Sequence, residues 1–247
     1  MVNKVTPAPK SRAPFFLLLL VIVVAGAGGI YAKMDASKSK PIVLAPGTPL
    51  PTSEGYLRGN ANAPVSIVEF GDFECPTCEH FATITEPDVR AKIVDAGLAS
   101  FRFYDFPLPM HANTMSASLA AACADHQGKF WEMHDALYQG QAEWNGQATT
   151  NPKKVIAGYV KRLGMDEKAW NNCFDSQKDV ARIEAHKAAG DKLGVNGTPT
   201  MVIDGKMYQQ PTWTYDEMRK LVDSLTLAKK VSGAGPVAPP AAPSTKK

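Results

Sequence analysis

The chain has few cysteines, no strongly basic face and no internal repeat. Its formal net charge is only +3, and the first dozen residues together with Lys246 and Lys247 carry more positive charge than this whole excess. A nucleic-acid-binding protein would cluster lysine and arginine on one face, so the charge pattern argues against such a partner. With 45% hydrophobic and 21% charged residues, the composition is that of one globular domain with tails.

One long hydrophobic run stands near the N-terminus. Twenty uncharged residues, APFFLLLLVIVVAGAGGIYA, occupy positions 13–32 and could cross a hydrocarbon core of about 30 Å as a helix. Lys4, Lys10 and Arg12 precede the run and favour a cytoplasmic location for residues 1–12. A cleavable signal peptide is the alternative, because Ala25-Gly26-Ala27 offers a small-x-small cleavage site. We expect a membrane anchor or a signal peptide that delivers the remaining residues to the periplasm or the outer face of a bacterial inner membrane.

The remaining chain divides by composition into three parts. Residues 33–56 contain four prolines among lysine, serine and threonine, which predicts an extended tether. Residues 57–230 hold the hydrophobic patterns of a folded domain. The segment 231–247, VSGAGPVAPPAAPSTKK, has no hydrophobic periodicity and is predicted to be disordered.

Within the domain, hydrophobic patterns predict strands at 65–70 and 100–106, separated by helix. Pro76 suits a first helical turn, and we expect that helix to end near Thr85, before Pro87. A helical block is predicted over about 112–193. The stretch TMVIDGKMY, 200–208, predicts a hairpin, and Thr214 with Glu217 forms the capping box of a final helix.

Two of the four cysteines stand close together in GDFECPTCEH, residues 71–80, with two residues between them. A Cys-x-x-Cys pair can act as a metal clamp, a permanent disulfide or a redox pair. Zinc would need two more ligands, and Cys123 and His126 are the best local candidates. An oxidising compartment and an even cysteine count favour disulfide chemistry instead. We therefore predict a redox pair and no metal.

The two sulfurs of this pair have different environments. Cys75 lies where a helix begins, and the unpaired N–H groups there stabilise a thiolate. Cys78 lies one turn deeper, where shielding raises the pKa of a thiol and suits it to act as the resolving partner. Opposing the first effect, Asp72, Glu74 and Glu79 crowd the motif, and nearby carboxylates raise the pKa of a thiol.

The other two cysteines, Cys123 and Cys173, both fall in the predicted helical block. In an oxidising compartment we expect them to form a second, structural disulfide. The alternative is a pair of buried reduced thiols that pack as small hydrophobic side chains.

Four stretches of the sequence resemble the DsbA-like thiol:disulfide oxidoreductases, and the resemblance covers roughly 57–229. They are RGNANAPVSIVEFGDFECPTCEHFA at 58–82, CADHQGKFWEMHDALY at 123–138, WNNCFDSQ at 170–177 and VNGTPTMVIDG at 195–205. The resemblance implies an α/β thioredoxin fold with a helical insertion. This agrees with the element order predicted above.

The resemblance also implies roles for individual residues. Cys75 would be the exposed sulfur that attacks and is attacked, and Cys78 would resolve the mixed disulfide. Pro199 would be a cis-proline facing the disulfide, preceded by Thr198, whose backbone pairs with an extended substrate segment. Glu69 matches the family's acid beneath the disulfide, which accepts the proton of Cys78. A solvent-facing strand position is the alternative for Glu69.

The dipeptide between the cysteines departs from the best-known oxidants of this family. Those contain a histidine there, whereas this chain has Pro76-Thr77. A threonine hydroxyl donates one hydrogen bond but carries no charge. Thr198 also resembles the residue of isomerases at that position, so the oxidising strength is not implied by the resemblance.

These features predict an extracytoplasmic enzyme that introduces disulfides into reduced, translocated proteins and needs no cofactor. The family implies a quinone-linked membrane oxidoreductase as the partner that reoxidises it, and the N-terminal segment predicts contact with membrane lipid. One alternative is an isomerase or reductase kept reduced by a membrane donor. Another is a tethered thioredoxin-like binding module without turnover.

The anchor can be tested by fractionation. We expect the mature protein to retain Phe15 and to stay with the membranes after a high-salt wash, because hydrophobic insertion resists salt whereas electrostatic adsorption is screened. Mass spectrometry of the mature N-terminus completes the test. A soluble mature chain beginning near Gly28 or Lys33 would show that the segment is a signal peptide.

Overall fold

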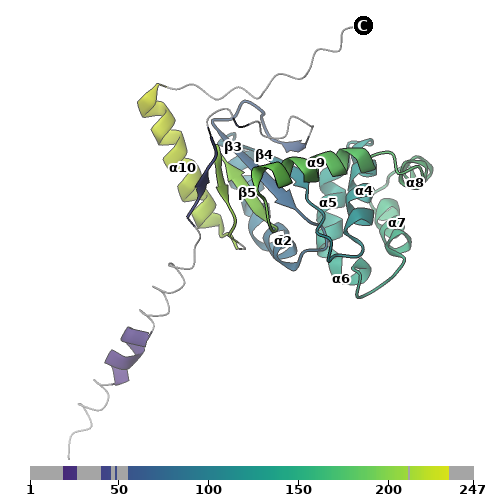
Figure 1. Cartoon of the computed structure of the whole chain (residues 1–247), viewed down its shortest axis with the longest axis horizontal. Coiled ribbons are helices and arrows are strands. Elements are labelled where there is room, and N and C mark those ends of the chain that lie inside the picture. Colours follow the sequence, from purple (N-terminus) through teal and green to yellow (C-terminus); the bar gives the residue numbers. More distant parts are fainter. Residues whose placement is uncertain (1–18, 27–39, 46–47, 49–54, 211, 234–247) are drawn as a thin grey trace, which may run out of the picture. The chain divides into compact units, whose positions relative to one another are not determined.

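The computed structural model describes residues 19–26, 40–45, 48, 55–210 and 212–233 (Figure 1). The chain divides into two units, Met1–Lys40 and Pro41–Lys247. In the first unit, residues 19–26 form a helix with exposed side chains. Among the described residues, no helix has the length and hydrophobicity needed to cross a membrane. The remainder of the predicted segment 13–32 lies outside them, so the anchor stays a prediction.

The second unit is built on a mixed sheet of six strands within the described residues, in the order β1-β6-β5-β3-β4-β2. The strands are β1 Ile42–Val43, β2 Tyr56–Arg58, β3 Val65–Gly71, β4 Ala99–Asp105, β5 Thr200–Ile203 and β6 Lys206–Tyr208. The central strands β3 and β4 are parallel, and β5 pairs with β3 antiparallel. The predicted strands and hairpin are confirmed to within one residue.

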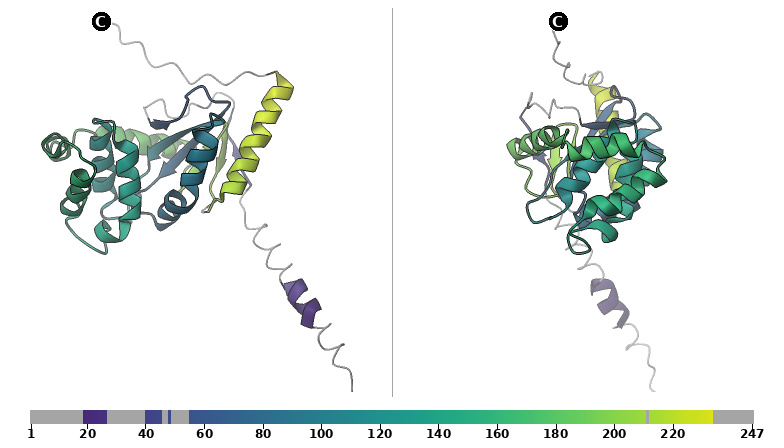
Figure 2. Two further views of the ribbon diagram at one scale, coloured as in Figure 1. Left: turned by 180° about the vertical axis from the view of Figure 1, so that it is seen from behind. Right: turned by 90° about the vertical axis from the view of Figure 1, so that its right-hand side faces the viewer.

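Helices cover the sheet and form a separate block beside it (Figures 1 and 2). The first helical run contains α2 Pro76–His80, η1 Phe81–Thr85, α3 Glu86–Val89 and η2 Arg90–Val94. The block contains α4 Thr114–Asp125, α5 Phe130–Gln139, α6 Gln141–Trp144, α7 Pro152–Arg162 and α8 Glu167–Asp175, followed by α9 Val180–Leu193 and, after the hairpin, α10 Tyr215–Ser232. Figure 2 shows α10 at one end of the unit and helices α4–α8 at the other.

Hydrophobic side chains fill both faces of the sheet. Ile67 and Phe101 belong to a buried cluster with Met218 of α10, whereas Val68 and Phe70 point to the opposite face and pack with Val195, just after α9. This alternation is the two-residue period of a strand covered on both sides. A third cluster fills the helical block and includes both Cys75 and Cys78, so the block packs directly against the cysteine motif.

Local signals account for several element boundaries. Asp204 and Gly205 have φ values of 50° and 78°, the left-handed pair that a two-residue hairpin turn requires. The side chain of Asn151 accepts from the Lys154 N–H at the start of α7. The capping box predicted for the last helix is present, with Thr214 and Glu217 each bonding to the other's backbone N–H.

Three predicted boundaries differ from the structure. The helix that begins at Pro76 continues past Pro87. A proline ring normally clashes with the carbonyl one turn earlier in a helix. Here the π-helical turn η1 lies just before Pro87 and widens the helix at that carbonyl. The predicted tether, 33–56, is not extended linker throughout: Ile42–Val43 pairs with β6 as an edge strand, and Tyr56 begins β2. The predicted disordered tail begins inside α10, and residues 234–247 lie outside the described part.

Candidate active site

The loop after β3 carries the cysteine motif and is held by the side chain of Asp72. One carboxylate oxygen accepts the N–H of Glu74 at 2.8 Å, and the other accepts the N–H of Leu108 at 2.8 Å. Cys75 follows in an extended conformation as the N-cap residue of α2, with Pro76 in the first turn. The Asp72 carboxylate thus fixes the turn that places Cys75 against the helical block.

The loop before β5 approaches the same sulfur. The register of β5 against β3, in which Phe70 pairs with Thr200, places this loop beside the motif. The Thr198–Pro199 peptide bond is cis. The carbonyl of Thr198 lies 3.4 Å from Cys75 Sγ and 3.0 Å from the hydroxyl of Thr77. The structure therefore brings together Cys75, Thr77 and the Thr198–Pro199 pair.

The hydroxyl of Thr77 has two neighbours that compete for its single proton. Its oxygen lies 3.0 Å from Cys75 Sγ and 3.0 Å from the Thr198 carbonyl oxygen. While Cys75 is a neutral thiol, the thiol can itself donate to that carbonyl. Once Cys75 ionises, the hydroxyl can turn to the sulfur, so it supplies a donor where the charge forms.

Cys75 is less exposed than the sequence predicts. Its exposed fraction is 6%, and that of Cys78 is 0%. The expected order of the two cysteines is correct, but Cys75 is largely covered by its surroundings. Part of that packing comes from the helical block, whose Gln141 side chain donates to the carbonyls of Phe73 and Cys75.

The two thiols are shifted in opposite directions. A hydrogen bond from Cys78, with a further hydrogen bond from Thr77, overcomes burial and lowers the pKa of Cys75 to about 5. Burial raises the pKa of Cys78 well above its ordinary value, and the neighbouring Cys75 raises it further. At neutral pH the reduced pair therefore holds one thiolate and one thiol that donates to it.

Glu69 lies on β3 with only 1% of its surface exposed. Burial raises the pKa of its carboxyl group well above the ordinary range, and the negative charges of Glu86 and Cys75 act in the same direction. One of its oxygens has no hydrogen-bond partner among the described residues. The alternative of a solvent-facing position is thus wrong, and burial favours the uncharged form of this acid.

The acidic residues around the motif do not act as the sequence predicts. The sequence predicts that Asp72 and Glu74 oppose ionisation of Cys75. In the structure, both carboxylates instead accept hydrogen bonds from backbone N–H groups. Glu74 accepts the N–H groups of Asn113 at 2.6 Å and Gly146 at 2.5 Å. These acids tie the motif to the helical block. The i to i+2 bond from Glu74 to Asp72 is a local signal that sequence reasoning missed, whereas Gln141, far away in the chain, gave none.

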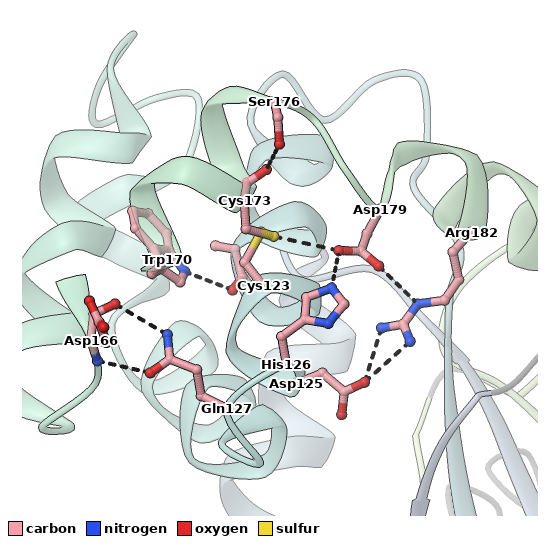
Figure 3. The surroundings of a disulfide bond; sticks show 11 residues. Cys123, Asp125, His126, Gln127, Asp166, Trp170, Cys173, Ser176, Asp179 and Arg182 are labelled. Carbon is pink, nitrogen blue, oxygen red and sulfur yellow. Dashed lines mark hydrogen bonds and ion pairs between the residues drawn. A yellow bond between two sulfur atoms is a disulfide. The ribbon is translucent and has the colours of Figure 1, made fainter. Parts of the chain in front are cut away.

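Cys123 and Cys173 form a disulfide between α4 and α8, with Cα atoms 5.7 Å apart (Figure 3). The expected second bond is therefore present. It also removes the zinc alternative, because Cys123 in a disulfide is not a thiolate ligand.

The family follows from comparison with known proteins. A family model described as thioredoxin matches residues 52–224. The chain therefore belongs to the thioredoxin family, as the resemblance in its sequence predicts. Its fold is the DsbA-like form with a helical insertion. The oxidised BdbD of Bacillus subtilis superposes with a TM-score of 0.63 at 20% identity, covering 77% of this chain and 100% of that structure.

Two curated relatives differ in how much of their length is matched. The Na(+)/H(+) antiporter NhaA 3 of Salinispora tropica is 33% identical over 164 residues, which are 66% of this chain and 24% of the antiporter. The chain thus spans about a quarter of that relative's length. The probable disulfide bond formation protein D of Bacillus anthracis is 25% identical over 166 residues, 67% of this chain and 75% of that protein.

The lowered pKa of Cys75 can be measured by alkylation of the reduced protein. The rate of reaction with iodoacetamide should fall with decreasing pH around a midpoint near 5, because only the thiolate reacts. Thr77→Val should move that midpoint upward by about one pH unit, the effect of losing one hydrogen bond to a charged group. Thr83→Val is the control, since that hydroxyl donates to the Glu79 carbonyl. An unchanged midpoint in Thr77→Val would contradict the assigned donor.

Proposed function

We propose that this chain is an extracytoplasmic thiol:disulfide oxidoreductase that introduces disulfides into translocated proteins. The observation that carries the proposal is the opposite shift of the two thiols, which lowers the pKa of Cys75 to about 5 and raises that of Cys78. A stabilised thiolate favours the reduced form of the enzyme, so the Cys75–Cys78 disulfide tends to oxidise other thiols. The hydroxyl of Thr77 provides part of this stabilisation without the charge of a histidine.

Oxidation proceeds in two exchanges. A substrate thiolate attacks Cys75 Sγ in the oxidised enzyme, the bond to Cys78 breaks, and a mixed disulfide forms. A second thiolate of the substrate then attacks the substrate sulfur of that mixed disulfide. The substrate disulfide forms, and Cys75 leaves as the thiolate that Cys78 and Thr77 stabilise. The two electrons end on the enzyme, as the Cys75 thiolate and the Cys78 thiol.

Glu69 supplies the proton that Cys78 needs when the enzyme disulfide breaks. Cys78 leaves the disulfide as a thiolate in a fully buried place, where a negative charge is costly. The protonated carboxyl group of Glu69 can transfer its proton to Cys78, whose pKa its own negative charge helps to raise. On reoxidation the proton returns, so the acid acts on Cys78 in both directions.

The Thr198–Pro199 loop provides the place for substrate. Because its backbone lies beside Cys75 Sγ, an extended segment of substrate could pair with it while its own cysteine reaches the sulfur. A backbone pairing of this kind does not select side chains, which suits an enzyme that acts on many unfolded proteins.

Location and partners complete the proposal. The Cys123–Cys173 disulfide is consistent with an oxidising compartment, and the hydrophobic segment 13–32 is consistent with export and with contact to membrane lipid. Turnover as an oxidase requires an acceptor for the electrons left on the reduced pair. We propose a quinone-linked thiol oxidoreductase in the membrane for this role.

A trapping experiment tests the assignment of Cys75. Cys78→Ala should accumulate mixed disulfides that form when the Cys75 thiolate attacks a disulfide of a substrate protein and expels a substrate thiolate. They should persist because the intramolecular thiol of Cys78, which would release the substrate by attacking Cys75 at high effective concentration, is gone. Cys75→Ala should trap far less, since the remaining Cys78 is buried and protonated. The measurement is a non-reducing gel of cells quenched with acid, run beside a reduced sample.

Two outcomes would refute this assignment. If Cys78→Ala forms no reductant-sensitive adducts, Cys75 does not exchange with proteins and a binding module is favoured. If both variants form equal amounts, the asymmetry between the two sulfurs is wrong.

A further inference from the structure

A pocket borders the second disulfide. Its volume is about 330 Å³, and it is lined by both cysteines of the bond together with His126, Asn172 and Lys178. The exposed fraction is 9% for Cys173 and 1% for Cys123. A small thiol that enters this pocket therefore comes next to the disulfide on the side of Cys173.

A carboxylate lies against this bond. The Oδ2 atom of Asp179 is 3.5 Å from Cys173 Sγ, and the sulfurs of both cysteines lie within 4.8 Å of this carboxylate (Figure 3). A sulfur in a disulfide carries no proton, so Cys173 cannot donate to Asp179 while the bond is closed. The contact is thus between a negative charge and a sulfur that offers it no hydrogen bond.

The side chains of His126 and Arg182 hold the carboxylate in this position. His126 Nε2 lies 2.8 Å from the oxygen that faces the sulfur, and Arg182 Nε lies 3.8 Å from the other oxygen. Only 7% of the Asp179 surface is exposed. Arg182 also donates to Asp125. Its guanidinium group therefore lies between the carboxylate of Asp125 and that of Asp179, and Asp179 is the one that contacts the disulfide.

We propose that Asp179 is a specificity-determining residue that makes the Cys123–Cys173 bond resistant to anionic thiolates and so confines exchange to Cys75. A thiolate that attacks Cys173 Sγ brings negative charge to the atom nearest the carboxylate, and the bond to Cys123 breaks with Cys123 leaving as a thiolate. Attack at Cys123 Sγ instead expels Cys173 as a thiolate beside Asp179. Either route develops negative charge next to a fixed one, which raises the barrier.

This role does not depend on the proposed activity of Cys75, because it concerns a different bond with its own readout. Protection by charge differs from protection by burial in how it affects charged and uncharged reductants. A thiolate reductant adds a negative charge to the bond. An uncharged phosphine adds none, because its attack leaves one sulfur as a cationic phosphonium and the other as a thiolate. The charge of Asp179 should therefore slow the phosphine much less than the thiolate.

The test measures opening of Cys123–Cys173 in the full chain by timed alkylation and peptide mass spectrometry, with thioglycolate or with tris(hydroxypropyl)phosphine as the reductant. Asp179→Asn keeps the size of the side chain and removes its charge. We expect it to accelerate opening by thioglycolate about tenfold and opening by the phosphine less than about twofold, the tenfold factor being that of about 1.4 kcal/mol in the barrier. Asp125→Asn, which removes the other carboxylate on Arg182, should change neither rate by more than about twofold.

Equal acceleration of both reductants by Asp179→Asn would overturn the proposal, because it would show a loosened structure rather than a lost charge. An unchanged thioglycolate rate would overturn it as well. If the variant does not fold, the unmodified chain decides. Its bond should open more slowly with thioglycolate than with the cationic thiol cysteamine, each rate being divided by that for an exposed model disulfide. The reverse order would mean that Lys178 and His126 control access, and the proposal would fail.

Discussion

The hydrogen bonds to Cys75 Sγ are the interaction on which the site depends, because they offset the cost of a negative charge on a sulfur that is only 6% exposed. The donors Cys78 and Thr77 both lie on the helix that the motif begins. The pairing of β5 with β3 brings the Thr198 carbonyl beside them, where it accepts from the Thr77 hydroxyl and from Cys75 as a neutral thiol. The sheet register and the start of α2 therefore together set the surroundings of this sulfur.

The two cysteine pairs of this chain differ in the charges and hydrogen-bond donors that surround their sulfurs. Around Cys75 the neighbouring side chains donate hydrogen bonds, and the nearby acids Asp72 and Glu74 are directed to backbone N–H groups. Around Cys173 the arrangement is reversed, since the carboxylate of Asp179 faces the sulfur. If both proposals hold, hydrogen-bond donors favour thiol exchange at Cys75, and a carboxylate opposes it at Cys173.

Sequence reasoning succeeded where the signal was local. The strand at 65–70, the Asp204-Gly205 turn and the capping box at Thr214 are each set by a few neighbouring residues, and the structure contains all of them. It was wrong where distant contacts decide. The covering of Cys75, the redirection of the motif's acids and the edge strand Ile42–Val43 depend on residues far away in the chain. Pro87 is a local failure, because a π-helical turn accommodated a residue that normally ends a helix.

The proposed oxidase donates a disulfide between Cys75 and Cys78 to other proteins. The redox state of this pair in the native compartment tests this role. It is measured by quenching cells with acid, alkylating the free thiols and identifying the modified peptides. An oxidase that is continually reoxidised should carry Cys75 and Cys78 mainly as a disulfide. If both cysteines are found mainly as alkylated thiols, electrons flow in the other direction, and the chain is a reductase or an isomerase.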